Sequence, residues 1–174
     1  MADKLRYYWD ACAWIGLIRQ EADKIDVLRY VIDRAQKGEV EIWTSTFTLA
    51  EVFKKKCDGE QKGLPTAEDQ AFDDYVRQDY VQLAQVDLDI GTLARRVLRQ
   101  YPKIRKPQDA IHVATALRYN IDELHTFDRD DLIALNGQID RADGKKLIIG
   151  KPPSPPAPPG PGPLFEGLKE ASNG

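Results

Sequence analysis

The spacing of hydrophobic residues along the chain switches repeatedly between a period of two, typical of strands, and one of about 3.6, typical of helices. Residues 5–9 form a short run rich in aromatic side chains that predicts a strand, and the alanine-rich apolar run at residues 11–18 predicts a helix. Asp10 lies at the junction between them. Apolar residues spaced by three and four then predict a second helix over residues 25–35, which ends near Gly38.

The same switching continues to residue 149. Further strands are predicted at residues 40–44, 81–86, 123–127 and 146–149. Further helices are predicted at residues 49–53, 66–76, 89–101, 107–117 and 129–135. Strands that alternate with helices pair in parallel through crossover helices. The sequence therefore predicts an α/β fold, a three-layer α/β/α sandwich with a central parallel sheet.

Composition divides the chain into one globular domain and a tail. With 174 residues, 42% hydrophobic and 30% charged, the chain is long enough for one well-packed soluble domain, predicted at residues 1–150. Residues 151–174 contain eight of the 11 prolines and have little to bury, which predicts an extended, disordered tail. No apolar run reaches the roughly 18 residues that span a bilayer, and the first residues lack the apolar core of a signal peptide. We therefore expect a cytoplasmic protein with no membrane partner.

Cysteine content and charge exclude several classes of protein. Cys12 and Cys57 are the only cysteines and neither belongs to a C-x-x-C pair, which gives no support to zinc-ribbon or thioredoxin chemistry. The net charge of −3 does not indicate a strongly basic nucleic-acid-binding domain, so any such contact needs a local basic patch. A patch of this kind is predicted on the solvent side of helix 89–101 and just after it, and its residues are Arg95, Arg96, Arg99, Lys103, Arg105 and Lys106.

Four acidic residues are predicted at one edge of the sheet. Asp10, Glu51 and Asp128 each follow a predicted strand, and the carboxyl ends of parallel strands meet at the edge where ligands bind. Asp109 lies in the first turn of the predicted helix 107–117, which is apolar nearly all round and is therefore expected to be buried. If the amino end of that helix opens on the same edge, the four carboxylates converge.

Each of these acids has a structural alternative, because a carboxylate at a strand end or in a first helical turn also caps the helix. Capping does not explain the apolar residues that flank Asp10, Glu51 and Asp109. Ionised acids gathered in apolar surroundings are tolerated when they share a cation. Oxygen ligands without nearby cysteines favour Mg²⁺ or Mn²⁺, and such a site beside a basic segment is suited to phosphodiesters. His112 and His125 are interpreted as core or supporting residues rather than ligands.

Four segments of the chain have the order and spacing of the motifs of a known family. They are residues 8–12 (YWDAC), 44–52 (TSTFTLAEV), 106–116 (KPQDAIHVATA) and 126–130 (TFDRD). Together they resemble the PIN domain family, and within it the toxin ribonucleases of the VapC type, and the similarity runs from residue 5 to residue 149. The resemblance implies a parallel α/β/α sandwich that cleaves RNA with Mg²⁺ or Mn²⁺.

The resemblance also implies roles for single residues and partners. The acidic quartet of the family, whose members act as catalytic residues and metal ligands, is matched by Asp10, Glu51, Asp109 and Asp128. Ser45 matches a polar residue often found beside the quartet, and Asp130 is assigned a supporting role, although Asp131 lies equally near the fourth position. A toxin of this kind has RNA as its substrate, forms a homodimer and is silenced by an antitoxin protein.

Other classes that use an acid at a strand end fit less well. A haloacid-dehalogenase-like phosphatase requires a second aspartate two positions after the first, where this chain has Cys12. The phosphoacceptor aspartate and later lysine of a receiver domain cannot be placed in this sequence. The alternative that stays open is a catalytically silent PIN-like module that acts as an RNA-binding or scaffold protein. The polar insert at residues 57–65 and the proline-rich tail depart from a typical toxin, but neither changes the quartet.

Overall fold

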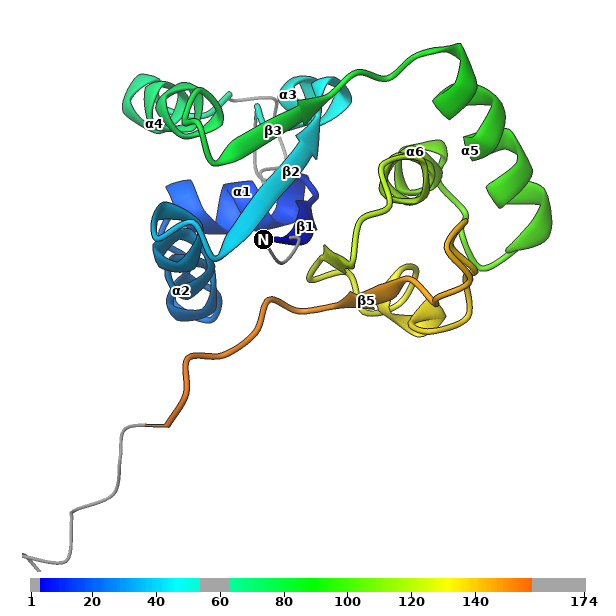
Figure 1. Cartoon of the computed structure of the whole chain (residues 1–174). Coiled ribbons are helices and arrows are strands. Elements are labelled where there is room, and N and C mark those ends of the chain that lie inside the picture. The colour runs from blue at the N-terminus through cyan, green and yellow to red at the C-terminus, as the bar shows by residue number, and fades with distance from the viewer. Residues whose placement is uncertain (1–3, 54–62, 158–174) are drawn as a thin grey trace, which may run out of the picture.

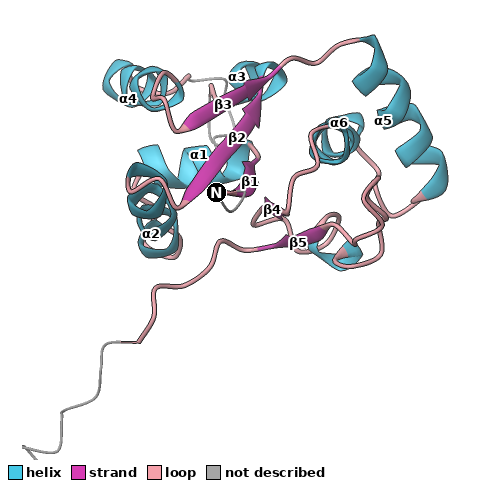
Figure 2. Ribbon diagram, viewed as in Figure 1, coloured by secondary structure: helices cyan, strands magenta, loops and turns pink. Residues whose placement is uncertain are grey.

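A computed structural model describes residues 4–53 and 63–157 and shows a five-stranded sheet. Its strands are β1 (Leu5–Trp9), β2 (Val40–Ser45), β3 (Val81–Ala84), β4 (Glu123–His125) and β5 (Ile148–Gly150). They lie in the order β3-β2-β1-β4-β5, and every neighbouring pair is parallel (Figures 1 and 2). The predicted parallel sheet is confirmed, and β1 is its middle strand.

Helices cover both faces of the sheet, which confirms the predicted three-layer α/β/α sandwich. They are α1 (Ala11–Ile18), α2 (Ile25–Gln36), α3 (Thr46–Glu51), α4 (Thr66–Val76), α5 (Leu88–Gln100) and α6 (Pro107–Arg118). Figure 1 shows α1, α2 and α4 on one side of the strands and α5 and α6 on the other. The short helix α3 continues directly from β2 at the carboxyl edge of the sheet.

The alternating side chains of β1 divide the hydrophobic core into two parts. Tyr7 and Trp9 belong to the core shared with α1, α2 and α4, whereas Tyr8 belongs to the core on the side of α5 and α6. Tyr8 and Trp9 are completely buried, as expected for a middle strand covered on both faces. Trp14 of α1 is also completely buried, and its Nε1 donates a hydrogen bond to Thr44 Oγ1 of β2 at 3.2 Å. These contacts fix α1 near the carboxyl ends of β1 and β2.

The segment after β4 differs from the sequence prediction. The predicted strand 123–127 ends at His125, and in place of a helix over residues 129–135 only Ile133–Leu135 form a 3₁₀ helix. Asp128 Oδ1 accepts hydrogen bonds from the backbone N–H groups of Asp130 at 3.2 Å and Asp131 at 3.1 Å. An aspartate that binds the amides following it stabilises a turn instead of a helix. The predicted helix over residues 129–135 is therefore wrong.

Beyond β5 the chain leaves the sheet. Residues 151–157 have no regular secondary structure, but Pro152 is buried, so packing contacts continue past the predicted boundary at residue 150. The rest of the predicted proline-rich tail, residues 158–174, lies outside the described residues, as does most of the predicted loop at 57–65. In the described part of the chain, no helix has the length and apolar character needed to cross a membrane.

His125 of β4 is completely buried, and its hydrogen bonds require a neutral ring. Trp9 Nε1 donates to His125 Nδ1 at 3.1 Å, which places the ring proton on Nε2, 3.2 Å from Glu123 Oε2. Burial lowers the pKa of His125 below its ordinary value, although Glu123 opposes this effect. The interpretation of His125 as a core residue is confirmed.

We predict that His125 makes the protein less stable in acid. Below about pH 6.5 the unfolded chain binds a proton at this side chain that the folded chain excludes. The free energy of unfolding therefore falls as the pH falls, by up to about 1.4 kcal/mol per pH unit. Urea denaturation between about pH 7.5 and about pH 5.5 measures this loss, which is expected to be smaller in His125→Gln. Equal losses in the two proteins would contradict the assignment.

Candidate active site

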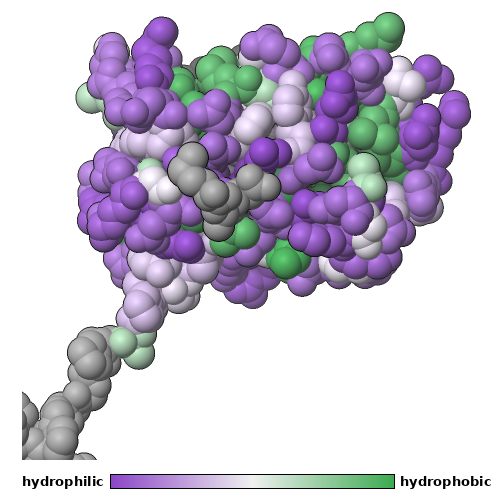
Figure 3. Space-filling model, viewed as in Figure 1, coloured by the Kyte–Doolittle hydropathy of each residue, from purple (hydrophilic) through white to green (hydrophobic). Residues whose placement is uncertain are grey.

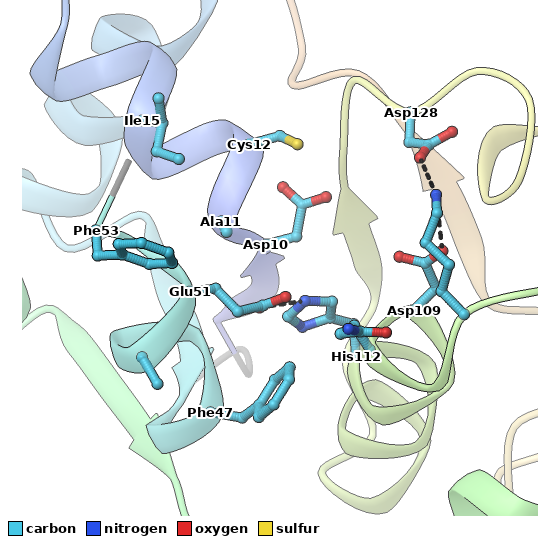
Figure 4. A pocket seen from close by; sticks show the side chains of 13 residues that line it. Asp10, Ala11, Cys12, Ile15, Phe47, Glu51, Phe53, Asp109, His112 and Asp128 are labelled. Carbon is cyan, nitrogen blue, oxygen red and sulfur yellow. Dashed lines mark ion pairs between the residues drawn. The ribbon is translucent and has the colours of Figure 1, made fainter. Parts of the chain in front are cut away.

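A pocket of about 410 Å³ opens at the carboxyl edge of the sheet (Figure 4). Its walls come from α1, α3, the start of α6 and the segment after β4. The residues that line it are Asp10, Ala11, Cys12, Ile15, Phe47, Ala50, Glu51, Phe53, Lys106, Gln108, Asp109, His112 and Asp128. All four acids of the predicted quartet are among them, so the fold brings these carboxylates from four separate segments to one place.

Asp10 both caps a helix and faces the pocket. It directly follows β1, and its Oδ1 accepts a hydrogen bond from the backbone N–H of Ala13 at 3.0 Å, which caps α1. Asp10 is only 4% exposed, and burial raises the pKa of its carboxyl group, against the opposing effects of His112 and Thr126. The capping alternative is thus confirmed for Asp10, and the cap coexists with its place in the pocket.

Glu51 is held by a buried histidine. Glu51 ends α3, and its Oε2 lies 2.8 Å from His112 Nε2 of α6. The other ring nitrogen, Nδ1, lies 2.9 Å from the hydroxyl group of Tyr8. Burial alone lowers the pKa of His112, but Tyr8, Glu51 and Asp10 outweigh burial and raise the pKa to about 10. His112 is therefore positively charged at neutral pH and acts as a buried counter-charge to Glu51.

Three aspartates approach one another where α6 meets the segment after β4, and two of them, Asp109 and Asp128, line the pocket. A carboxylate oxygen from each of Asp109, Asp128 and Asp131 lies within 4.8 Å of the other two. Lys106 Nζ lies 2.8 Å from Asp131, 3.7 Å from Asp128 and 3.8 Å from Asp109. Burial raises the pKa of Asp109, and Lys106 opposes this rise. These residues form a three-aspartate cluster with an ammonium group beside it.

The three-aspartate cluster fits a hard divalent cation. Asp109 Oδ2 is buried and has no hydrogen-bond partner among residues 4–53 and 63–157. A buried carboxylate oxygen without a hydrogen bond is costly unless a cation binds it, and oxygen ligands of this kind suit Mg²⁺ or Mn²⁺. Asp10 and Glu51 line the same pocket but are not part of the cluster. Metal binding by the whole quartet stays a prediction, and Asp131 joins the candidate ligands.

Comparison with known protein families adds to this geometry. A family model described as PIN domain matches residues 7–137, which is more than half of the chain. The chain belongs to the PIN domain family. The matched region includes all four acids of the quartet, Asp10, Glu51, Asp109 and Asp128. A search of curated proteins found no match.

Solved structures with the fold of this PIN domain include bacterial toxins. The VapC20 toxin of Mycobacterium tuberculosis, described as cleaving the sarcin-ricin loop, is 17% identical, with a TM-score of 0.55 over 71% of this chain and 91% of the toxin. A toxin–antitoxin complex from Klebsiella pneumoniae gives 18% identity and a TM-score of 0.54 over 86% and 99% of the two chains. VapBC2 from Rickettsia felis, bound to promoter DNA, gives 16% identity and a TM-score of 0.52 over 83% and 98%. Identities this low establish the shared fold alone.

The two supporting residues predicted for this PIN domain do not line the pocket. Ser45 is buried and caps α3, because its Oγ accepts a hydrogen bond from the N–H of Thr48 at 3.2 Å. Asp130 is exposed and contributes its backbone N–H to Asp128. Asp131 is buried and belongs to the cluster. The supporting roles stay predictions, whereas the position of Asp131 follows from the turn that Asp128 caps.

The predicted basic patch of the PIN domain is mostly separate from the acidic pocket. Its exposed members are Arg95, Arg96, Arg99, Lys103 and Arg105. The three arginines lie on α5 and line, with Thr92, a second pocket of about 210 Å³. Figure 3 shows hydrophilic residues along the edge of the molecule that α5 forms. Of the six predicted residues, Lys106 is the one that lines the acidic pocket.

Proposed function

We propose that this PIN domain is a metal-dependent endoribonuclease that hydrolyses RNA phosphodiester bonds and acts as the toxin of a toxin–antitoxin pair. The main support is the convergence of the acidic quartet, Asp10, Glu51, Asp109 and Asp128, on one pocket at the carboxyl edge of a parallel sheet. Membership of the PIN domain family points in the same direction. A toxin that cleaves cellular RNA acts in the cytoplasm, which is the location we propose.

The proposed cofactor is Mg²⁺ or Mn²⁺, which Asp109, Asp128 and Asp131 would hold, while Asp10 and Glu51 complete the acidic lining of the pocket. When bound, the ion supplies positive charge that stabilises the transition state of the phosphodiester and favours deprotonation of the attacking water. The positively charged His112 lies 2.8 Å from Glu51 Oε2 and fixes the position of that side chain. The side chain of Asp10 is fixed by its bond to α1. The chain thus orients these carboxylates before RNA binds, which reduces the cost of organising the site during the reaction.

The exposed basic residues are proposed to hold the RNA backbone. The arginines of α5 form a local positive surface on a chain whose net charge is −3, so they offer phosphates a site that the overall charge does not. Contacts of this kind position the substrate without reading its sequence. Lys103 and Arg105 lie in the loop between this surface and the acidic pocket, and they extend the positive surface toward α6.

An antitoxin protein and a second copy of the chain are the proposed partners. The similar structure from Klebsiella pneumoniae is a toxin–antitoxin complex, which supports an antitoxin for this chain. The acidic pocket is open and would attract a basic side chain from such a partner. Occupation of the pocket in this way would exclude RNA, so the antitoxin would silence the enzyme directly.

Removal of the metal tests the proposed function. Purified protein is expected to cut labelled RNA in Mg²⁺ or Mn²⁺, because the acidic pocket repels phosphate until a cation neutralises it. Excess EDTA is expected to stop the cleavage, and added Mn²⁺ is expected to restore it, as read on a denaturing gel. Circular dichroism in EDTA serves as the control for folding. RNA binding without cleavage in either metal would favour the alternative, a catalytically silent RNA-binding or scaffold module.

A further inference from the structure

The fold positions Lys106 to meet the three-aspartate cluster. Lys106 is the residue before α6, with an extended backbone, and Pro107 begins the helix directly after it. Two residues earlier Ile104 is buried in the core. The backbone is therefore anchored on both sides of Lys106, and its Nζ donates a hydrogen bond to Asp131 Oδ2 at 2.8 Å. The packed part of the domain therefore fixes the backbone from which the Lys106 side chain reaches the cluster.

Two of the carboxylate oxygens near Lys106 accept no hydrogen bond from a backbone N–H group in the described part of the chain. Asp128 accepts two backbone N–H groups with Oδ1, and its Oδ2 lies 3.7 Å from Lys106 Nζ. Asp109 Oδ2 has no hydrogen-bond partner in the described part of the chain and lies 3.8 Å from the same nitrogen. One ammonium group beside three carboxylates leaves two negative charges uncompensated. A single divalent cation would neutralise these two negative charges. However, the ammonium group already contacts the carboxylate oxygens that such a cation would bind.

We propose that Lys106 is an internal counter-ion of the metal site, which holds the three carboxylates together before the metal binds and competes with the metal for their oxygens. The inference rests on one part of the proposed function, namely that the three-aspartate cluster is the metal site. Two cations on the same oxygens repel each other, so the divalent ion enters as Nζ moves away. The Lys106 side chain is 43% exposed and has solvent to move into. Lys106 is therefore a positioning residue rather than a contact for the RNA backbone.

Lys106→Met tests the competition, because methionine has a similar length and no charge. Without the counter-ion the three carboxylates repel one another, so the melting temperature of the metal-free protein is expected to fall. Mn²⁺ then has no competitor, and its affinity is expected to rise by roughly three- to tenfold. Isothermal titration calorimetry with Mn²⁺ alone measures this affinity without RNA. A lysine with a merely structural role would not produce these opposite changes, since its loss would weaken both folding and metal binding.

Lys37→Met is the matched control, because Lys37 forms an exposed ion pair with Asp33 on a helix outside the pocket. Its affinity for Mn²⁺ is expected to equal that of the wild type. Equal or weaker binding of Mn²⁺ by Lys106→Met would overturn the counter-ion proposal alone, and the nuclease proposal would stand. If neither the wild type nor Lys106→Met binds Mn²⁺, the counter-ion proposal and the metal-dependent function both fail.

Discussion

Asp10→Asn is expected to lower metal-dependent cleavage of RNA by roughly 100-fold or more while the domain stays folded. Asparagine is as good a helix cap as aspartate, so its side-chain oxygen can still accept the N–H of Ala13. The substitution removes a negative charge that burial disfavours, as the raised pKa of Asp10 indicates. The melting temperature of the metal-free variant should therefore equal or exceed that of the wild type, whereas cleavage is lost.

Two further variants separate the cap from the chemistry. Asp10→Ala is expected to lose the cleavage activity and also about 1 kcal/mol of stability, because alanine cannot cap α1. Asp79→Asn changes an exposed aspartate that does not line the pocket and should cleave RNA like the wild type. Purified in the same way, it controls for contaminating ribonuclease. Cleavage by Asp10→Asn at the wild-type rate would remove Asp10 from the proposed site.

Trp14→Ala is expected to lower the free energy of unfolding by about 3–5 kcal/mol. Trp14 is completely buried, and the centroid of its ring lies 4.9 Å from that of the Trp9 ring and 5.7 Å from that of the Phe72 ring. The truncation leaves a cavity between α1, α4 and the sheet and leaves Thr44 Oγ1 without the hydrogen bond from Nε1. Urea denaturation followed by circular dichroism measures the loss.

Trp43→Ala is the matched control for this loss. Trp43 is only half-buried on β2, where its Nε1 donates to Glu41 Oε2 at 3.1 Å and its ring lies 5.2 Å from that of Tyr119. The half-buried Trp43 side chain buries less apolar surface than Trp14 does, so Trp43→Ala is expected to lose less stability than Trp14→Ala. A loss in Trp14→Ala no larger than that in Trp43→Ala would show that α1 is not fixed by its tryptophan.

Most of the fold could be predicted from the sequence because each element has its own pattern. The apolar positions of α2 and α5 repeat at helical spacing, and β1 is short, aromatic and followed at once by a helix. The alternation of strands and helices then leaves few arrangements besides a parallel sheet. The ends of the elements were less predictable, because an end depends on single hydrogen bonds. The turn at Asp128 replaced a predicted helix for this reason.

The sequence allowed us to predict which acidic residues line the pocket, but not which side chains contact one another inside it. Parallel strands end at one edge, so the residues after them could be expected to meet. Which carboxylates approach within ligand distance depends on side-chain directions that spacing does not determine. Asp131 joined the cluster, rather than Asp130, because the turn directs its side chain toward Lys106. The contact between Glu51 and His112 joins α3 to α6, elements far apart in the chain, and no local pattern signals it.

The middle strand of the sheet also limits which substitutions the pocket can tolerate. Tyr8 lies in the core, completely buried, yet its hydroxyl group meets the ring of His112 and helps to keep that ring charged. Since β1 is paired on both sides, it cannot change register to compensate for a different side chain. A substitution at Tyr8 would therefore remove a hydrogen-bond partner of His112, the histidine that contacts Glu51, without changing any residue that lines the pocket. In this domain, solvent exposure is a poor guide to which mutations affect the pocket, because a residue of the hydrophobic core holds the histidine that contacts Glu51.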